Sequence, residues 1–278
     1  PMTALSAARC LPDGVVLRNL ESAGDHAQCL ELQRETWGRD FEELVAPAIL
    51  GIANKLGGVA AGAFEGTTLV GFVLGFTGLS EGQPVHWSHM LAVEGSRRGR
   101  GLGRELKRYQ RDQLLRLGVK TMYWTFDPLV VRNAALNLNR LGARPEEYVR
   151  DLYGSGEGSE LHRGLGTDRF VVRWQLDADE PGRAPREVAA VACNTDPDDG
   201  APVARPRGIE GDTVWVEVPC DIHAVLRADP RTAALWRAST RAALEHCLGR
   251  GYRAAAVDRL AGDRERWAYR MVRDGGQA

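Results

Sequence analysis

The strongest constraint in this sequence is a stretch in which three glycines are interleaved with arginine and leucine, between a strand-like run and a helix-like run. Residues 85–93 (VHWSHMLAV) are predicted to form a strand, and SRRGRGLGR follows at 96–104. Leu102, Leu106 and Leu114 then recur at helical spacing, which predicts a helix that ends near Gly118. Glycines leave backbone N–H groups unobstructed, and a helix N-terminus carries partial positive charge. This junction therefore predicts a site for an anion such as phosphate.

Three phosphate-binding motifs can be compared with this segment. A P-loop requires Gly-Lys-Ser/Thr at the start of the helix, where this chain has GLGRE. A dinucleotide fingerprint requires GxGxxG in a βαβ unit, whereas here GxGxG follows strands that look antiparallel. The pattern Arg/Gln-x-x-Gly-x-Gly/Ala after an apolar strand fits residues 98–103. Together with residues 91–93, this segment resembles the acyl-CoA pyrophosphate loop of the GNAT N-acyltransferases.

The resemblance extends over about 15–176. The chain is expected to form a strand (15–20), two helices (22–37 and 41–56), three strands (57–64, 68–76 and 85–93), a loop and helix (102–117), a strand (119–126), a helix (130–141) and two strands (147–153 and 169–176). Ser22 and Asp25 resemble a capping box that opens the first helix, Pro47 should break or restart the second, and 57–64 and 68–76 should form a hairpin. This order is similar to the GNAT fold, an α/β (α+β) fold with a mixed, mostly antiparallel central sheet flanked by helices. Its two splayed strands would be 85–93 and 119–126. WTFDPLVVRNAALNLNRLGA and LHRGLGTDRF resemble a branch of predicted acetyltransferases with a C-terminal extension.

The chain is expected to have three parts. Residues 15–176 would form a GNAT acyl-CoA-binding domain, and 177–212, rich in Pro, Gly, Asp and Arg, would be a linker or irregular connection with one short strand at 187–192. Residues 213–278 would form a C-terminal β-α-β-β region, with a helix that Asp229-Pro230 opens. The order of its elements is similar to the second half of a GNAT domain, but the sequence ADPRT stands before its helix in place of a glycine loop. The region is therefore interpreted as a degenerate half-GNAT that binds no second CoA.

The resemblance implies a cofactor and residues that hold it. The cofactor would be acetyl-CoA or another short acyl-CoA. Asn133, near the start of the 130–141 helix, would bond the pantetheine arm, or else be an ordinary exposed Asn. The remaining CoA-binding residues implied by the motif are Leu91, Ala92, Val93, Arg98, Gly99, Arg100, Gly101, Leu102 and Gly103.

His89, four residues before Val93, is the candidate general base, since an ordinary His titrates near 6.5. The alternative is a buried His that only satisfies a hydrogen bond, and His86 has the opposite strand parity. In the family a Tyr usually serves as the general acid, and its position here is Leu138. Asn137, Asn139 and Tyr153 are other proton donors to consider. The missing Tyr leaves open a non-catalytic acyl-CoA-binding sensor or regulatory module.

Residues at predicted strand ends and loops are candidates for binding the acceptor, namely Thr125, Asp127, Arg163, Asp168 and Arg169. Arg binds carboxylates in a bidentate manner, so an amino acid acceptor or a dicarboxylic acyl group such as succinyl are options. The simpler interpretation of each charge is a surface residue or an ion pair. The expected partners are a small-molecule amine and, as one option, a second copy of the chain in a homodimer.

Composition narrows the classes of function. Lys and Arg total 36 against 37 Asp and Glu, and this balance is not that of a chain devoted to nucleic acid. The simpler interpretation of the Arg-rich loop is a glycine-rich turn followed by a solvated basic helix face. The five cysteines lie far apart without metal-ligand spacing, so no metal site is expected. Neither a membrane-spanning run nor a secretory signal is expected, and the expected location is the cytoplasm.

Overall fold

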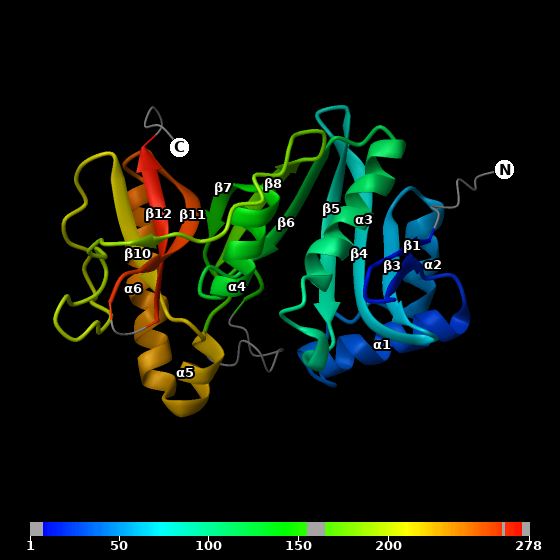
Figure 1. The fold of residues 1–278 in the computed structure, drawn as a ribbon, viewed down its shortest axis with the longest axis horizontal. Helices are drawn as coiled ribbons and strands as arrows, with labels where there is room; N and C mark the ends of the chain where they lie inside the picture. The colour runs from blue at the N-terminus through cyan, green and yellow to red at the C-terminus, as the bar shows by residue number, and fades with distance from the viewer. Residues whose placement is uncertain (1–7, 155–164, 263–264, 274–278) are drawn as a thin grey trace. The chain divides into compact units, whose positions relative to one another are not determined.

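The computed structural model describes residues 8–154, 165–262 and 265–273, and they form two compact units (Figure 1). The first unit holds 8–124 and 174–179, and the second holds 125–154, 165–173 and the described residues from 180 onward. The three parts expected from the sequence, 15–176, 177–212 and 213–278, stay predictions. The boundary between the two compact units falls at other residues.

The first unit is built on a sheet in the order β1-β2-β3-β4-β5-β6. Neighbouring strands from β1 to β5 are antiparallel, and β5 and β6 are parallel through Val85–Thr121, His86–Met122 and Trp87–Tyr123. Their register covers these three pairs, after which the two strands diverge. The strands are β1 Arg9–Cys10, β2 Val16–Asn19, β3 Val59–Glu65, β4 Thr68–Ser80, β5 Gln83–Val93 and β6 Thr121–Phe126.

Three helices accompany this sheet: α1 (Ala23–Trp37), α2 (Pro47–Lys55) and α3 (Leu102–Arg116). Helix α1 begins with the predicted capping box, in which the Ser22 side chain accepts from Asp25 N and the Asp25 side chain accepts from Ser22 N. The helical stretch expected at 41–56 is helical only from Pro47 onward, at the residue that was expected to break or restart it. Helix α2 begins at Pro47, because the proline fixes a helical φ but cannot extend a helix from its N-terminal side.

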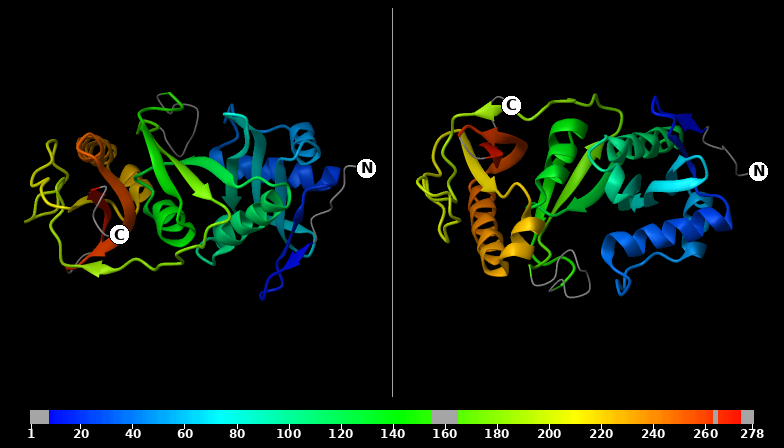
Figure 2. Two further views of the ribbon diagram at one scale, coloured as in Figure 1. Left: turned by 90° about the horizontal axis from the view of Figure 1, so that it is seen from above. Right: turned by 60° about the horizontal axis from the view of Figure 1, so that its bottom comes forward.

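The two faces of the sheet carry different helices (Figure 2). Helices α1 and α2 cover one face, where Leu32 and Leu50 belong to one core cluster with Phe72, Leu74 and Met90. Helix α3 covers the other face, where Lys107 lies against Met122. Removing this apolar surface from water contributes about 25 cal/mol per Å2 to the stability of the unit.

The second unit contains a four-stranded sheet in the order β10-β12-β11-β9 and an antiparallel pair, β7 and β8. The predicted helix opened by Asp229-Pro230 is confirmed as α6, and α5 lies directly before it, where no helix was expected. The elements of this unit are α4 Val131–Ala134, the π-helix η2 Ala135–Leu141, β7 Arg144–Val149, β8 Arg169–Gln175, β9 Glu187–Val188, β10 Thr213–Val218, α5 Ile222–Ala228, α6 Pro230–Leu248, β11 Tyr252–Leu260 and β12 Arg266–Arg273.

The predicted fold class is confirmed, because the sheet is mixed, mostly antiparallel and flanked by helices. The helix expected at 130–141 is present, but most of it has π geometry, which sequence periodicity does not reveal. Every helix in the described part of the chain is too short or too polar to cross a membrane.

Candidate functional site

The predicted anion site lies where β5 leads into α3. A short 3-10 turn, η1 (Gly95–Arg97), is followed by Gly99 and Gly101, which have φ values of 82° and 84°. These left-handed conformations are natural for glycine and strained for most other residues. A Cβ at either position would meet open space, so backbone conformation rather than crowding selects glycine here.

Gly101 is the N-cap of α3 and supplies no side-chain cap. Hydrogen bonding within the helix starts with Arg104 N and Glu105 N, both bonded to Gly101 O. The N–H groups that precede them are the ones that a helix leaves for a cap, water or a ligand. This helix end can therefore donate to an anion.

The arginines of the loop have different surroundings. Arg97 is held by Glu65 through two bonds of 2.7 and 2.6 Å, so its charge is already paired. Arg98 is exposed, and its Nε donates to the Val93 carbonyl at 3.0 Å, which fixes the stem of the side chain beside the loop. Arg100 is exposed as well. Arg98 and Arg100 are thus the loop arginines best placed to meet an anion from solvent.

His89 lies at a β-bulge of β5. Leu74 pairs with Met90 and Gly75 pairs with Ser88, so His89 is the extra residue between two pairs. The side chain is exposed and its ring centroid is 6.0 Å from that of Phe76. Partial burial of the ring lowers the pKa of His89 below 6.5, and nearby Glu43 opposes this effect. A neutral imidazole at neutral pH suits the predicted role of base.

His86 has no such exposure. It lies on the opposite face, in a buried chain of hydrogen bonds. Lys107 Nζ donates to Ser88 Oγ at 2.8 Å, and Ser88 Oγ donates to Gln110 Oε1 at 2.8 Å. Gln110 Nε2 then lies 3.0 Å from His86 Nε2, and His86 Nδ1 lies 3.0 Å from Thr77 Oγ1.

The direction of these bonds assigns the protonation of His86. An amide NH2 can only donate, so His86 Nε2 accepts and the proton of the neutral ring is on Nδ1. Burial, together with the nearby Lys107, lowers the pKa of His86 to about 3, consistent with a neutral ring. Burial also lowers the pKa of Lys107, whose Nζ lies 3.9 Å from the centroid of the Trp124 ring. His86 is therefore part of the packing beneath α3.

The predicted acceptor residues Thr125, Asp127 and Arg169 lie together in the second unit. The Thr125 and Tyr153 hydroxyls are 3.1 Å apart, and the Arg169 guanidinium lies 5.3 Å from the centroid of the Tyr153 ring. Arg169 Nη1 is 3.6 Å from Asp127 Oδ2. Arg163 lies outside the described residues.

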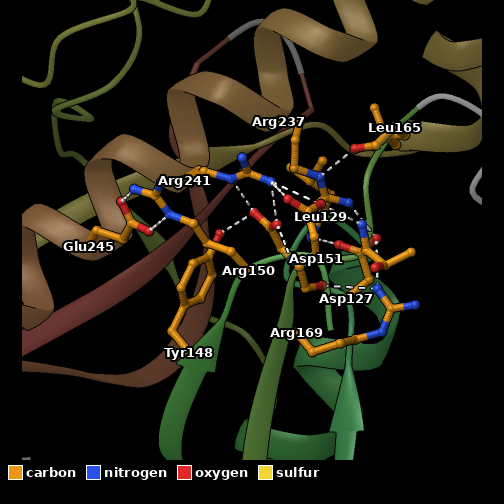
Figure 3. A network of polar contacts seen from close by, with 12 residues as sticks. Asp127, Leu129, Tyr148, Arg150, Asp151, Leu165, Arg169, Arg237, Arg241 and Glu245 are labelled. Carbon is orange, nitrogen blue, oxygen red and sulfur yellow. Dashed lines mark hydrogen bonds and ion pairs between the residues drawn. The ribbon is translucent and has the colours of Figure 1, made fainter. Parts of the chain in front are cut away.

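A network of ion pairs surrounds these residues (Figure 3). Asp127 accepts from Arg237 of α6 at 2.6 Å and from Leu129 N at 2.9 Å. Asp168 is fully buried and accepts from Arg241 at 2.5 and 2.8 Å. Because Asp127 and Asp168 are paired with arginines of α6, their charges also serve to hold that helix in place.

The remaining predicted residues have separate surroundings. Asn133 is exposed at α4, and Leu138 is buried. Asn139 Nδ2 donates to the Val257 carbonyl at 2.7 Å, and Asn139 Oδ1 accepts from Val257 N at 2.9 Å, so both ends of this amide are bonded within the second unit. Sequence reasoning missed the buried chain of hydrogen bonds through Lys107. Within the described ranges, no three His, Cys, Asp or Glu side chains gather as metal ligands would.

A comparison with protein families identifies part of the chain. Residues 26–142 match the model of the acetyltransferase (GNAT) family, which confirms the resemblance first seen in the glycine loop. This range includes the loop, the bulge at His89 and all of α3. A search of curated protein sequences gave no match.

Solved structures are similar at low identity. The ribosomal-protein-S18-alanine N-acetyltransferase of Escherichia coli is 16% identical with a TM-score of 0.44, over 59% of this chain and 96% of that chain. An aminoglycoside 6'-N-acetyltransferase of Enterococcus faecium is 17% identical with a TM-score of 0.43, over 59% and 98%. A chain of the NatC complex bound to Gag peptide and CoA is 19% identical with a TM-score of 0.45, over 58% and 98%.

Proposed function

We propose that the GNAT acetyltransferase domain at residues 26–142 is an acyl-CoA-dependent N-acyltransferase, which transfers an acetyl or other short acyl group to a small-molecule amine. One observation carries the proposal. The N-terminal end of α3 has Gly101 in place of a capping side chain, and Arg98 and Arg100 lie exposed beside it. Backbone N–H groups and guanidinium groups together suit a pyrophosphate.

The residues present fit an acyl-CoA molecule. The N–H groups at the start of α3 and the Arg98 and Arg100 side chains would hold its phosphates. Strand β5 diverges from β6 after Trp87, so the backbone groups of Leu91 and Val93 on that side are not paired with β6 and would line the cofactor. When bound, acyl-CoA supplies a thioester, whose carbonyl carbon forms the new bond to nitrogen as the carbon–sulfur bond breaks and a thiolate leaves.

His89 takes the proton that the attacking amine must lose. It lies at the bulge of β5, four residues before the end of the strand, and its lowered pKa keeps the ring neutral at neutral pH. A positioned base contributes about 10²- to 10⁴-fold to the rate of such a proton transfer. His86 takes no part, because it is buried on the other face and bonded on both ring nitrogens.

A second candidate function is acyl-CoA binding without turnover, as in a sensor. Leu138 favours it, because this buried side chain occupies the position of the usual tyrosine acid and has no proton to donate. In an active enzyme the thiolate would take its proton from water. A thiolate is a good enough leaving group for this, since an ordinary thiol has a pKa near 8.5.

Release of free thiol distinguishes the two functions. The wild-type protein is incubated with acetyl-CoA or succinyl-CoA and a panel of amines and amino acids. We expect amine-dependent thiol release with at least one pair. Tight binding of acetyl-CoA without release above the hydrolysis rate for any amine would favour the sensor.

His89→Gln tests the base. The substitution keeps most of the volume and a hydrogen bond, yet kcat/KM should fall about 10²-fold while CoA affinity stays unchanged. Wild-type kcat/KM should fall as the pH drops below 6.5, because His89 must be neutral to accept a proton and its pKa is lowered. If the variant keeps wild-type kcat/KM and the same acid limb, His89 is not the base.

A further inference from the structure

Three aromatic side chains lie in a row across the middle of the first unit's sheet. Phe76 of β4 is the register partner of Trp87 of β5, and Trp87 is the register partner of Tyr123 of β6. Register partners point to the same face of a sheet. Adjacent strands are about 4.8 Å apart, so the row is about 10 Å long. Phe76, Trp87 and Tyr123 are called the aromatic row below.

The row lies on the face of the sheet that α1 and α2 cover, beyond the part they cover. Phe72 and Leu74, which alternate with Phe76 along β4, are fully buried in the core cluster with these helices. Phe76 and Trp87, by contrast, keep 36% and 37% of their surface exposed. Tyr123 is half-buried. A partly exposed aromatic row that continues a buried core is typical of a binding surface.

The row ends at the candidate base and at a negative charge. The His89 ring lies 6.0 Å from the Phe76 ring. Glu43 lies in the loop between α1 and α2, two residues before Val45, which packs in the core cluster with Leu74 and Met90 on this face, and its charge acts on the pKa of His89. Aromatic faces and a carboxylate both attract cations. An amine in water is mostly a cation before it reacts. The surroundings of His89 therefore favour a positively charged molecule with an apolar body.

We propose that the aromatic row binds the acceptor, and that this acceptor is a primary amine with an aromatic or other flat apolar body. The apolar body lies on Trp87 and its neighbours, and the amine end is drawn to Glu43, which brings the nitrogen next to His89. The role as an acceptor site rests on the proposed N-acyltransferase function, whereas the binding itself does not. The row also disfavours acceptors with a carboxylate near Glu43, because like charges repel there.

Equilibrium binding of two matched probes to the full chain tests the proposal. Phenethylamine carries a cation and 3-phenylpropionate an anion on nearly the same phenyl-bearing chain. By titration calorimetry, phenethylamine should bind at least 10-fold more tightly, and Glu43→Gln should reduce that difference. Equal affinity of the wild-type chain for both probes, or no binding of phenethylamine, would overturn the proposal.

Substitutions at the row locate the site. Trp87→Leu removes the ring but keeps apolar surface, and it should weaken phenethylamine binding about 3- to 30-fold, whereas Trp87→Phe should keep most of it. Leu79→Ala is the control, because Leu79 is exposed on the same β4–β5 hairpin but points to the opposite face. Circular dichroism melts verify that each variant folds. Equal loss in Trp87→Leu and Leu79→Ala would overturn the proposal.

The thiol-release assay separates this proposal from the proposed function. If phenethylamine binding depends on Trp87 but no amine releases thiol, the aromatic row stands as a cation site and the N-acyltransferase function fails. If amines without an apolar body release thiol while phenethylamine neither binds nor reacts, the N-acyltransferase function stands and the aromatic row fails.

Discussion

Two helix N-termini in this chain are capped in opposite ways. Helix α3 of the first unit begins at Gly101, which offers no side chain to its N–H groups. Helix α6 of the second unit begins at Asp229, whose carboxylate accepts from Arg231 N at 2.9 Å and from Thr232 Oγ1 at 2.7 Å. The first helix end is open to an external anion, and the second already holds its own.

The difference shows what makes a helix end a ligand site. Every α-helix has N–H groups without an intrahelical partner and a partial positive charge at its N-terminus. At α6 these groups are consumed by Asp229, and Pro230 removes a further N–H group. A phosphate there would meet a carboxylate. The presence of a helix N-terminus after strand β10 in the C-terminal region therefore does not imply a second CoA site.

The largest expected effect comes from making α3 resemble α6. Gly101→Asp places a carboxylate at the open helix end, and Asp tolerates a positive φ better than most residues. CoA affinity should fall about 100-fold or more, because the carboxylate repels the phosphates. Titration calorimetry with CoA measures the loss.

Gly101→Asn is the matched control for that prediction. Asn has nearly the same shape and the same tolerance for a positive φ, but it carries no charge. It should lose much less affinity than Gly101→Asp. Equal losses of CoA affinity in the two variants would mean that crowding, rather than charge, governs binding at this site. If both variants kept the wild-type CoA affinity, CoA would bind elsewhere.

A smaller effect is expected from the arginines beside the same helix end. Arg98→Ala should weaken CoA binding about 10-fold, since it removes one charge-assisted contact at an exposed site. Arg97→Ala should weaken it less than 3-fold, because Glu65 already holds the Arg97 guanidinium. The ratio of the two dissociation constants is the measurement. A larger loss for Arg97→Ala would contradict the assignment of Arg98 and Arg100 to the phosphates.

Local chemistry explains what sequence predicted correctly. The capping box of Ser22 and Asp25, the hairpin of β3 and β4, and the start of α6 at Asp229-Pro230 depend on residues close together in the chain. The glycine loop belongs to the same class, because its conformation and its helix dipole are both local. These features could therefore be located from the sequence, and the family match agrees with the loop.

Features that depend on pairing between distant segments cannot be located from local sequence. The bulge at His89 exists only in the register of β5 against β4, and the aromatic row needs the registers of three strands. Lys107 belongs to a run of seven Lys and Arg within 97–111, for which a solvated helix face was the simpler alternative, yet it is buried against Trp124. A helical charge pattern does not specify which of its residues faces a sheet.

The smallest expected effect is that of removing the cap of α6. Asp229→Ala removes the cap of α6, so the melting temperature should fall by a few degrees, as cap removal commonly causes. Hydrogen bonds from Thr232 and the Arg231 backbone lower the pKa of Asp229. The stabilisation is therefore present above the ordinary pKa of Asp and is lost as the pH falls through the lowered one.

CoA binding provides the complementary test of the same variant. Without Asp229 the end of α6 still lacks the two left-handed glycines and the exposed arginines of the α3 loop, so uncapping alone should not create a CoA site. Calorimetry should give one CoA per chain for the wild type and for Asp229→Ala, with the same affinity. If only Asp229→Ala bound a second equivalent of CoA, the Asp229 carboxylate alone would explain why α6 does not bind CoA. The glycine loop of α3 would then contribute little to CoA binding.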